Sequence, residues 1–201
     1  MQVGGLLLVL TVLLSSSGEK SAANHLAAGA LAFREARYGE ALVEFRVAQA
    51  LGSADAGPYV GASLVKLGRA EEAVEAFSAS AGGRDPLLDY YHAIACYEAR
   101  LYQRADHLLA GVGARSGPRI AEQASKTRAA IGAELAKESA QPTIDWYLAR
   151  CAERRDSAQS VLAAAFCREA AGLAERRADR YRLAEAAAQL ASLPGRPAVA
   201  R

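Results

Sequence analysis

The stretch that decides the fold is 27–51, AAGALAFREARYGEALVEFRVAQAL. In it a small residue, Gly29, is followed twelve positions later by Ala41 and four further on by Phe45. The same spacing returns twice at a constant interval of thirty-two positions, in the sets Gly61, Ala73 and Phe77 and then Ala93, Ala105 and Leu109. A short fixed period indicates a stack of small structural units.

Each unit is predicted to be a helical hairpin. A small residue lets two helices approach closely, and a large residue four positions after a second small one lies on the same helical face. The first helix therefore offers a notch and the second a plug. One hairpin cannot bury its apolar face alone, so neighbouring units must stack.

The pattern resembles the tetratricopeptide repeat family, with Gly29, Tyr38, Ala41, Phe45 and Ala48 in the places of its signature. The resemblance implies an all-α, right-handed superhelical stack. The units are two residues shorter than the usual 34 and lack the Trp and most closing prolines of the family. A weaker fourth match keeps the spacings and puts Ala188 in place of the plug, in the set Gly172, Tyr181 and Ala184.

The predicted organisation has four parts. Residues 1–23 are expected to be a signal peptide or anchor, 24–112 three repeats, 113–193 an irregular helical cap with the weak unit, and 194–201 a frayed tail. Paired helices are expected at 24–36 and 39–51, 55–67 and 70–81, and 86–99 and 102–111; single helices follow at 118–138, 143–155, 157–177 and 179–193. The Gly-rich segment 111–117 is expected to be an inter-helix loop.

The N-terminal apolar run favours export. Leu6 to Leu14 is apolar except for Thr11, which is too short to span a membrane comfortably but fits a signal-peptide core. Ser21-Ala22-Ala23 would suit cleavage, and a retained segment would allow membrane association through residues 1–17. Against export, no Lys or Arg precedes the run, so a cytoplasmic protein is the alternative.

The charge and the cysteines leave alternatives open. Residues 115–201 carry a net charge of +5 against −3 for the rest, which favours a solvated surface over a phosphate-binding patch. Cys96 falls at a core position. Cys151 and Cys167 would pair in an oxidising compartment only if the hairpin turns near Gln159, because a turn at Asp156 leaves a mismatch of about 9 Å along the helix axes.

The resemblance implies that the first helix of each unit lines a binding groove. Its positions here are Leu26, Ala30 and Phe33, then Pro58, Ala62 and Val65, then Tyr90, Ile94 and Tyr97, with Arg34, Lys66 and Glu98 at the edge. The groove would be apolar and aromatic. It lacks the Lys and Asn with which one family subtype clamps a carboxylate, so it suits an amphipathic helix or an extended apolar segment of another protein. Alternatively, residues 118–138 cover it.

No catalytic, metal or phosphate motif occurs in the sequence. His92 and Cys96 share a helical face but are two ligands at most. A thiol enzyme based on Cys151 or Cys167 would need a partner His, and residues 151–201 contain none. We therefore expect a non-enzymatic adaptor without cofactor or metal that does not bind nucleic acid and helps assemble a cell-envelope complex. A cytoplasmic interaction or regulatory module is the alternative.

Overall fold

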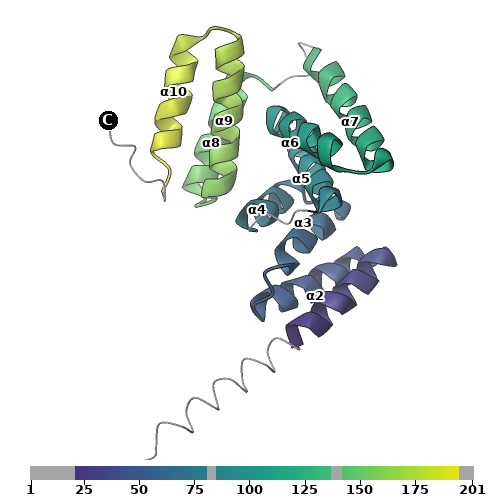
Figure 1. Cartoon of the computed structure of the whole chain (residues 1–201). Coiled ribbons are helices and arrows are strands. Elements are labelled where there is room, and N and C mark those ends of the chain that lie inside the picture. Colours follow the sequence, from purple (N-terminus) through teal and green to yellow (C-terminus); the bar gives the residue numbers. More distant parts are fainter. Residues whose placement is uncertain (1–20, 81–84, 137–141, 195–201) are drawn as a thin grey trace, which may run out of the picture. The chain divides into compact units, whose positions relative to one another are not determined.

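The computed structural model describes residues 21–80, 85–136 and 142–194, and these residues form helices without a strand. Residues 21–34 are helical, and the later helices are α2 (Tyr38–Ala50), α3 (Ala56–Lys66), α4 (Ala70–Ala79), α5 (Pro86–Glu98), α6 (Tyr102–Arg115), α7 (Pro118–Ala136), α8 (Ile144–Asp156), α9 (Ser160–Arg176) and α10 (Arg180–Ala191). The predicted all-α stack of helical hairpins is confirmed (Figure 1). The predicted signal peptide or anchor, up to residue 20, and the predicted tail, from residue 195, lie outside the described residues.

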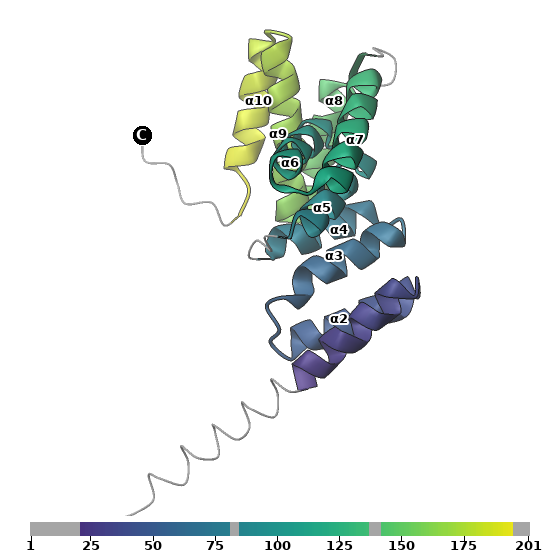
Figure 2. The same cartoon turned by 45° about the vertical axis from the view of Figure 1, so that its right-hand side comes forward.

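The chain divides into two compact units, residues 1–84 and 85–201. In the first unit, α3 packs against both α2 and α4. In the second unit, α6 packs against α5 and α7, and α9 packs against α8 and α10. Figure 2 shows α9 and α10 as an antiparallel pair beside α8.

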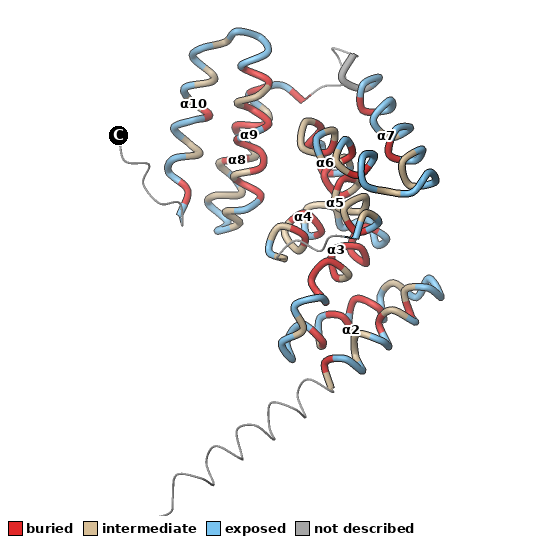
Figure 3. Tube along the Cα trace, viewed as in Figure 1, coloured by how far each residue is buried: buried red, intermediate tan, exposed pale blue. Residues whose placement is uncertain are grey.

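Notch and plug meet as predicted in the first two hairpins. A Cβ added at Gly29 would lie 2.7 Å from two ring carbons of Phe45, and one at Gly61 would lie equally close to the ring of Phe77. The third hairpin has Ala93 and Leu109 at these positions, both fully buried. Figure 3 shows buried residues on the helices that carry these positions. Small residues are therefore required in the first helix of the first two hairpins, because the partner ring touches its backbone.

The turn inside each hairpin recurs with the same period. Ala36, Gly68 and Arg100 all have positive φ, at 59°, 71° and 61°. The next residue donates its N–H to the carbonyl five residues back, as Arg37 does to Ala32 at 2.9 Å. This is the Schellman ending of a helix, which places one residue in the left-handed region. A glycine fits there without strain, whereas Ala36 and Arg100 adopt the conformation at a cost.

The same helix-ending turn occurs between α9 and α10, at Ala178 with φ of 55°, and between α8 and α9. Ala158 has positive φ at 58°, and Gln159 donates to the carbonyl of Arg154 at 2.8 Å. Counting back from this turn, Cys151 stands where the earlier units have their notch residue, and Cys167 stands where they have the plug. These two cysteines form a disulfide with a Cα–Cα distance of 5.3 Å. The disulfide takes the place of the notch-and-plug contact.

The predicted fourth match at Gly172 does not pack like the first three. Tyr181 is 76% exposed, and Ala184 and Ala188 are exposed as well. A Cβ at Gly172 would collide with the side-chain amide of Gln103 on α6, not with a plug on α10. Gly172, Tyr181 and Ala184 keep the sequence spacing of the earlier units, but that spacing does not determine which side chain lies against the glycine.

The predicted loop at 111–117 is wrong in its first five residues, because α6 continues to Arg115. Val112 is fully buried, and Arg115 donates a hydrogen bond from Nε to the carbonyl of Gly111 at 3.0 Å. Burial of one large side chain offsets the cost of about 1 kcal/mol for each helical glycine. Cys96, by contrast, is fully buried as predicted.

Candidate functional site

The predicted groove residues fall into two classes of burial. Six are half-buried or more accessible, namely Leu26, Ala30, Phe33, Tyr90, Ile94 and Tyr97. All three from α3 are buried, namely Pro58, Ala62 at 1% exposure and Val65 at 8%. The central residues of the predicted groove are therefore almost inaccessible to a partner. The accessible groove residues lie within residues 21–34 and on α5.

The accessible face of α5 carries two tyrosines and an isoleucine. Tyr90, Ile94 and Tyr97 are spaced four and three residues apart, which places them on one side of the helix. The ring of Tyr97 packs on Tyr102 of α6, with centroids 5.8 Å apart. In the first unit the equivalent pair is formed by Phe33 and Tyr38, whose rings meet edge-on at 5.2 Å. These contacts fix the aromatic rings and leave part of Tyr97 and Phe33 exposed.

Helix α7 covers one end of that face. It packs on α6 and also meets α5, and the Tyr90 hydroxyl lies 3.4 Å from Oγ1 of Thr127. Ala124 and Ile131, part of the apolar stripe of this helix, are each 1% exposed. The alternative that residues 118–138 cover the groove therefore holds at Tyr90, while Ile94 and Tyr97 stay half-buried.

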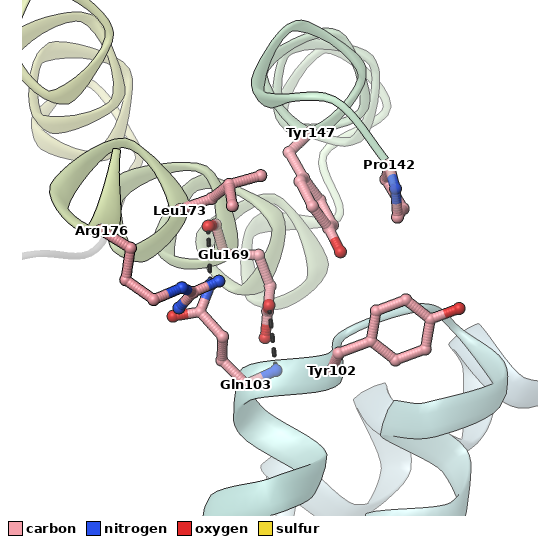
Figure 4. A pocket seen from close by; sticks show the side chains of 7 residues that line it. All are labelled: Tyr102, Gln103, Pro142, Tyr147, Glu169, Leu173 and Arg176. Carbon is pink, nitrogen blue, oxygen red and sulfur yellow. Dashed lines mark hydrogen bonds between the residues drawn. The ribbon is translucent and has the colours of Figure 1, made fainter. Parts of the chain in front are cut away.

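A second cluster joins α8 and α9 to the start of α6, and sequence reasoning missed it (Figure 4). The carboxylate of Glu169 accepts hydrogen bonds from the backbone N–H groups of Gln103 at 3.1 Å and Arg104 at 2.9 Å. The Gln103 amide donates back to the carbonyl of Glu169 at 2.9 Å. On the other side of the turn, the Tyr147 hydroxyl donates to the carbonyl of Arg100 at 2.6 Å. Each helix of the disulfide-linked hairpin thus supplies a contact.

Glu169 replaces a missing helix cap. The first N–H groups of a helix have no partner inside it, and the N-cap residue of α6, Leu101, makes no side-chain cap. A carboxylate is also favoured at a helix N-terminus by the helix dipole. Glu169 is only 3% exposed, and its burial raises the pKa of the carboxyl group while the backbone N–H donors oppose that rise. Burial likewise raises the pKa of the Tyr147 hydroxyl, so it stays a donor.

The space inside this cluster is too small for a ligand. It is lined by Tyr102, Gln103, Pro142, Tyr147, Glu169, Leu173 and Arg176, and offers about 10 Å³ to water-sized molecules. That is roughly what one water molecule needs. The cluster is therefore a structural joint, and a site for an organic ligand has to be sought elsewhere.

The repeat itself contained a signal for the joint. At the start of the second helix, the first two units have Arg37 and Arg69, which pair with glutamates three residues on. The third unit has Leu101 at this position, fully buried. This repeat position is charged in the first two units and apolar in the third. Such a change indicates a surface that is buried in the third unit and exposed in the others.

Other predicted chemistry can be placed as well. Cys96 is too buried to ionise readily, with its pKa raised to about 12, and the sulfurs of Cys151 and Cys167 are bonded to each other. Among the described residues, no three His, Cys, Asp or Glu side chains are grouped to hold a metal ion. In that same part of the chain, no helix is both long and apolar enough to cross a bilayer. Comparisons with protein families, with curated proteins and with solved structures find no match.

Proposed function

We propose that this chain is a non-enzymatic adaptor of the tetratricopeptide type, which binds an apolar segment of another protein. The observation that carries the proposal is the half-buried aromatic face of α5, where Ile94 and Tyr97 stay accessible although α6 and α7 pack on the same helix. Rigid, partly exposed aromatic side chains are frequent anchors of protein interfaces. An amphipathic helix with apolar residues at spacings of three and four would match this face.

A photoreactive amino acid tests the proposal. Ala62, central in the predicted groove, is unsuitable because it is 1% exposed, so the group is placed at Ile94, with exposed Ala110 of α6 as the control position. In the native cell we expect one dominant adduct from position 94 and none of the same mass from position 110. Equal adducts from both positions, or only adducts within the chain to α7, would contradict the proposal.

A matched pair of substitutions checks that the contact is apolar. Tyr97→Glu places a charge on the half-buried face, and Tyr181→Glu places the same charge on a side chain that is 76% exposed on α10. We expect Tyr97→Glu to reduce the position-94 adduct at least about tenfold, because a charge in an apolar contact must be desolvated. Tyr181→Glu should leave the adduct unchanged. Far-UV circular dichroism of both variants excludes unfolding.

The proposal places the adaptor outside the cytoplasm, at the cell envelope. It is supported by the apolar run at Leu6 to Leu14 and by the buried disulfide of Cys151 and Cys167, because disulfides persist in oxidising compartments. Alkylation of free thiols in cells lysed directly into denaturant without reductant, read by mass, should modify neither cysteine, although unfolding exposes both. Both cysteines found alkylated, together with full-length protein in the cytosolic fraction, would favour the cytoplasmic alternative.

A further inference from the structure

A depression between α6 and α9 is lined by basic side chains. It has a volume of about 320 Å³ and is formed by Gln103, Arg104, His107, Ala165, Arg168 and Glu169. This volume lies at the lower end of the range for small-molecule sites, about 300–1,000 Å³. Two arginines and a histidine come from two different helices, so their convergence depends on the packing of α9 against α6.

The repeat shows that the basic character is particular to this unit. The three α6 positions that line the depression correspond, one repeat earlier, to Glu71, Glu72 and Glu75 on α4. All three acids are replaced in the third unit, by Gln103, Arg104 and His107. The negative surface that the second unit carries at the start of its second helix has become positive.

The acids that the second unit has at the start of its second helix are absent from α6, where the carboxylate of Glu169 from α9 takes their place. Acidic side chains near a helix N-terminus are favourable and basic ones unfavourable, by about 0.3–1 kcal/mol each. Helix α4 follows the rule with Glu71 and Glu72 in its first turn, while α6 has no acid there. Arg104 of α6 and Arg168 of α9 therefore bring positive charge to a surface whose equivalent α4 positions in the second unit are all acidic.

Arg104 is also held in place. The Arg104 guanidinium lies 3.5 Å from Nε2 of His92 on α5, toward which it can donate. Burial, with the positive charge of Arg104, lowers the pKa of His92 to about 4, so the imidazole is a neutral acceptor at pH 7. The one carboxylate in the lining, Glu169, is directed to the backbone N–H groups at the start of α6. Arg168 and His107 are exposed at the opening.

We propose that this depression binds a small oxyanion carrying two or more negative charges, with Arg104 and Arg168 as its main contacts and His107 at its edge. Arginine recognises planar carboxylate and tetrahedral phosphate groups through two parallel N–H donors. Both groups share this chemistry, and the volume suits a metabolite-sized anion. The site is separate from the aromatic face of α5 and does not depend on the adaptor function.

Isothermal titration of the purified full chain tests the proposal. Inorganic phosphate and citrate are each titrated at constant ionic strength, with sodium chloride as the reference. We expect saturable one-to-one binding of at least one of the two, and the tighter one identifies phosphate or carboxylate as the preferred group. A heat of titration that does not reach saturation, or an equal heat with sodium chloride, would overturn the proposal.

Three variants separate a built site from general attraction to a basic surface. Arg168→Gln removes a contact at an exposed position and should weaken binding about 10- to 100-fold. Arg104→Glu restores the charge of the equivalent Glu72 and should abolish binding. Arg180→Gln, at an exposed position of α10 outside the depression, should bind like the wild type. Equal weakening by Arg168→Gln and Arg180→Gln would mean an adventitious ion only and would refute the site, as would unchanged binding by Arg168→Gln. Should Arg104→Glu unfold, the Arg168→Gln comparison still decides.

Discussion

The contact between Gly61 and Phe77 is the sharpest test of how the repeat packs. Gly61→Ala adds a Cβ that would lie 2.7 Å from Cδ2 and Cε2 of the ring, where ordinary contacts are 3.4–4 Å. The ring would have to move by several tenths of an ångström or more, and Phe77 is only 8% exposed, so little space is open to it. Overpacking of this kind costs about 2–3 kcal/mol. The better helix propensity of alanine returns about 1 kcal/mol, so we expect a net loss of about 1–2 kcal/mol.

The third hairpin suggests how the loss can be repaired. It carries alanine at the notch and leucine at the plug, as Ala93 and Leu109, both fully buried. Phe77→Leu alone should also destabilise, because it leaves a cavity. In the double variant Gly61→Ala with Phe77→Leu, the added methyl fills that space. We expect the double variant to be at least about 1 kcal/mol more stable than the sum of the two single losses predicts.

Urea unfolding followed by far-UV circular dichroism measures these differences. Gly39→Ala is the matched control, because a Cβ at Gly39 of α2 meets nothing within 4 Å. It should be neutral or stabilising by up to about 1 kcal/mol. Two results would refute the reasoning. One is a Gly61→Ala variant as stable as Gly39→Ala, and the other is strict additivity in the double-mutant cycle.

Three further predictions concern the turns, the pH dependence and the joint. Ala36→Gly should stabilise by about 1 kcal/mol and Gly68→Ala should destabilise by a similar amount, because both residues have positive φ; opposite shifts of the urea midpoint check this. His92 has its pKa lowered to about 4, so protons bind the unfolded chain first, and stability should fall as the pH drops from about 6.5 to 4, by at most about 3 kcal/mol. His92→Gln should flatten that slope in urea titrations at several pH values. Glu169→Ala leaves two N–H groups of α6 without their acceptor and should cost about 2 kcal/mol or more, whereas Glu169→Gln, which keeps one acceptor, should lose less in the same assay.

The sequence predicted the helices well because their determinants are local. The constant repeat period placed the helices, and the glycine and proline positions set most ends, so that α5 begins at Pro86 as expected. Misplaced ends have tertiary causes. Helix α6 runs through two glycines because Val112 is buried, and that burial depends on neighbouring helices that a local pattern does not describe.

The candidate sites were less predictable, for a physical reason. The joint at Glu169 links residues 66 positions apart in the chain, and no periodicity of the sequence relates them. The groove residues were assigned from their place in the repeat, which determines the side of the helix but not what covers it. Ala62 and Ile94 occupy the same repeat position, yet Ala62 is 1% exposed and Ile94 is half-buried.

The disulfide hairpin explains why the sequence places the fourth unit on the wrong pair of helices. The repeated feature is a distance between two helices, set by a turn with one left-handed residue and by two positions with the sequence separation of 16 that Cys151 and Cys167 show. A glycine with a phenylalanine occupies these two positions in the first two units, and an alanine with a leucine occupies them in the third. Two cysteines fit the distance between α8 and α9, because a disulfide needs Cα atoms about 4.4–6.8 Å apart and these two are 5.3 Å apart. The close approach that demands a small residue in the first units is therefore what allows a covalent link in α8 and α9. Residue types alone point to α9 and α10 as the fourth unit, whereas the close approach of the helices is found in α8 and α9, where the two cysteines are joined.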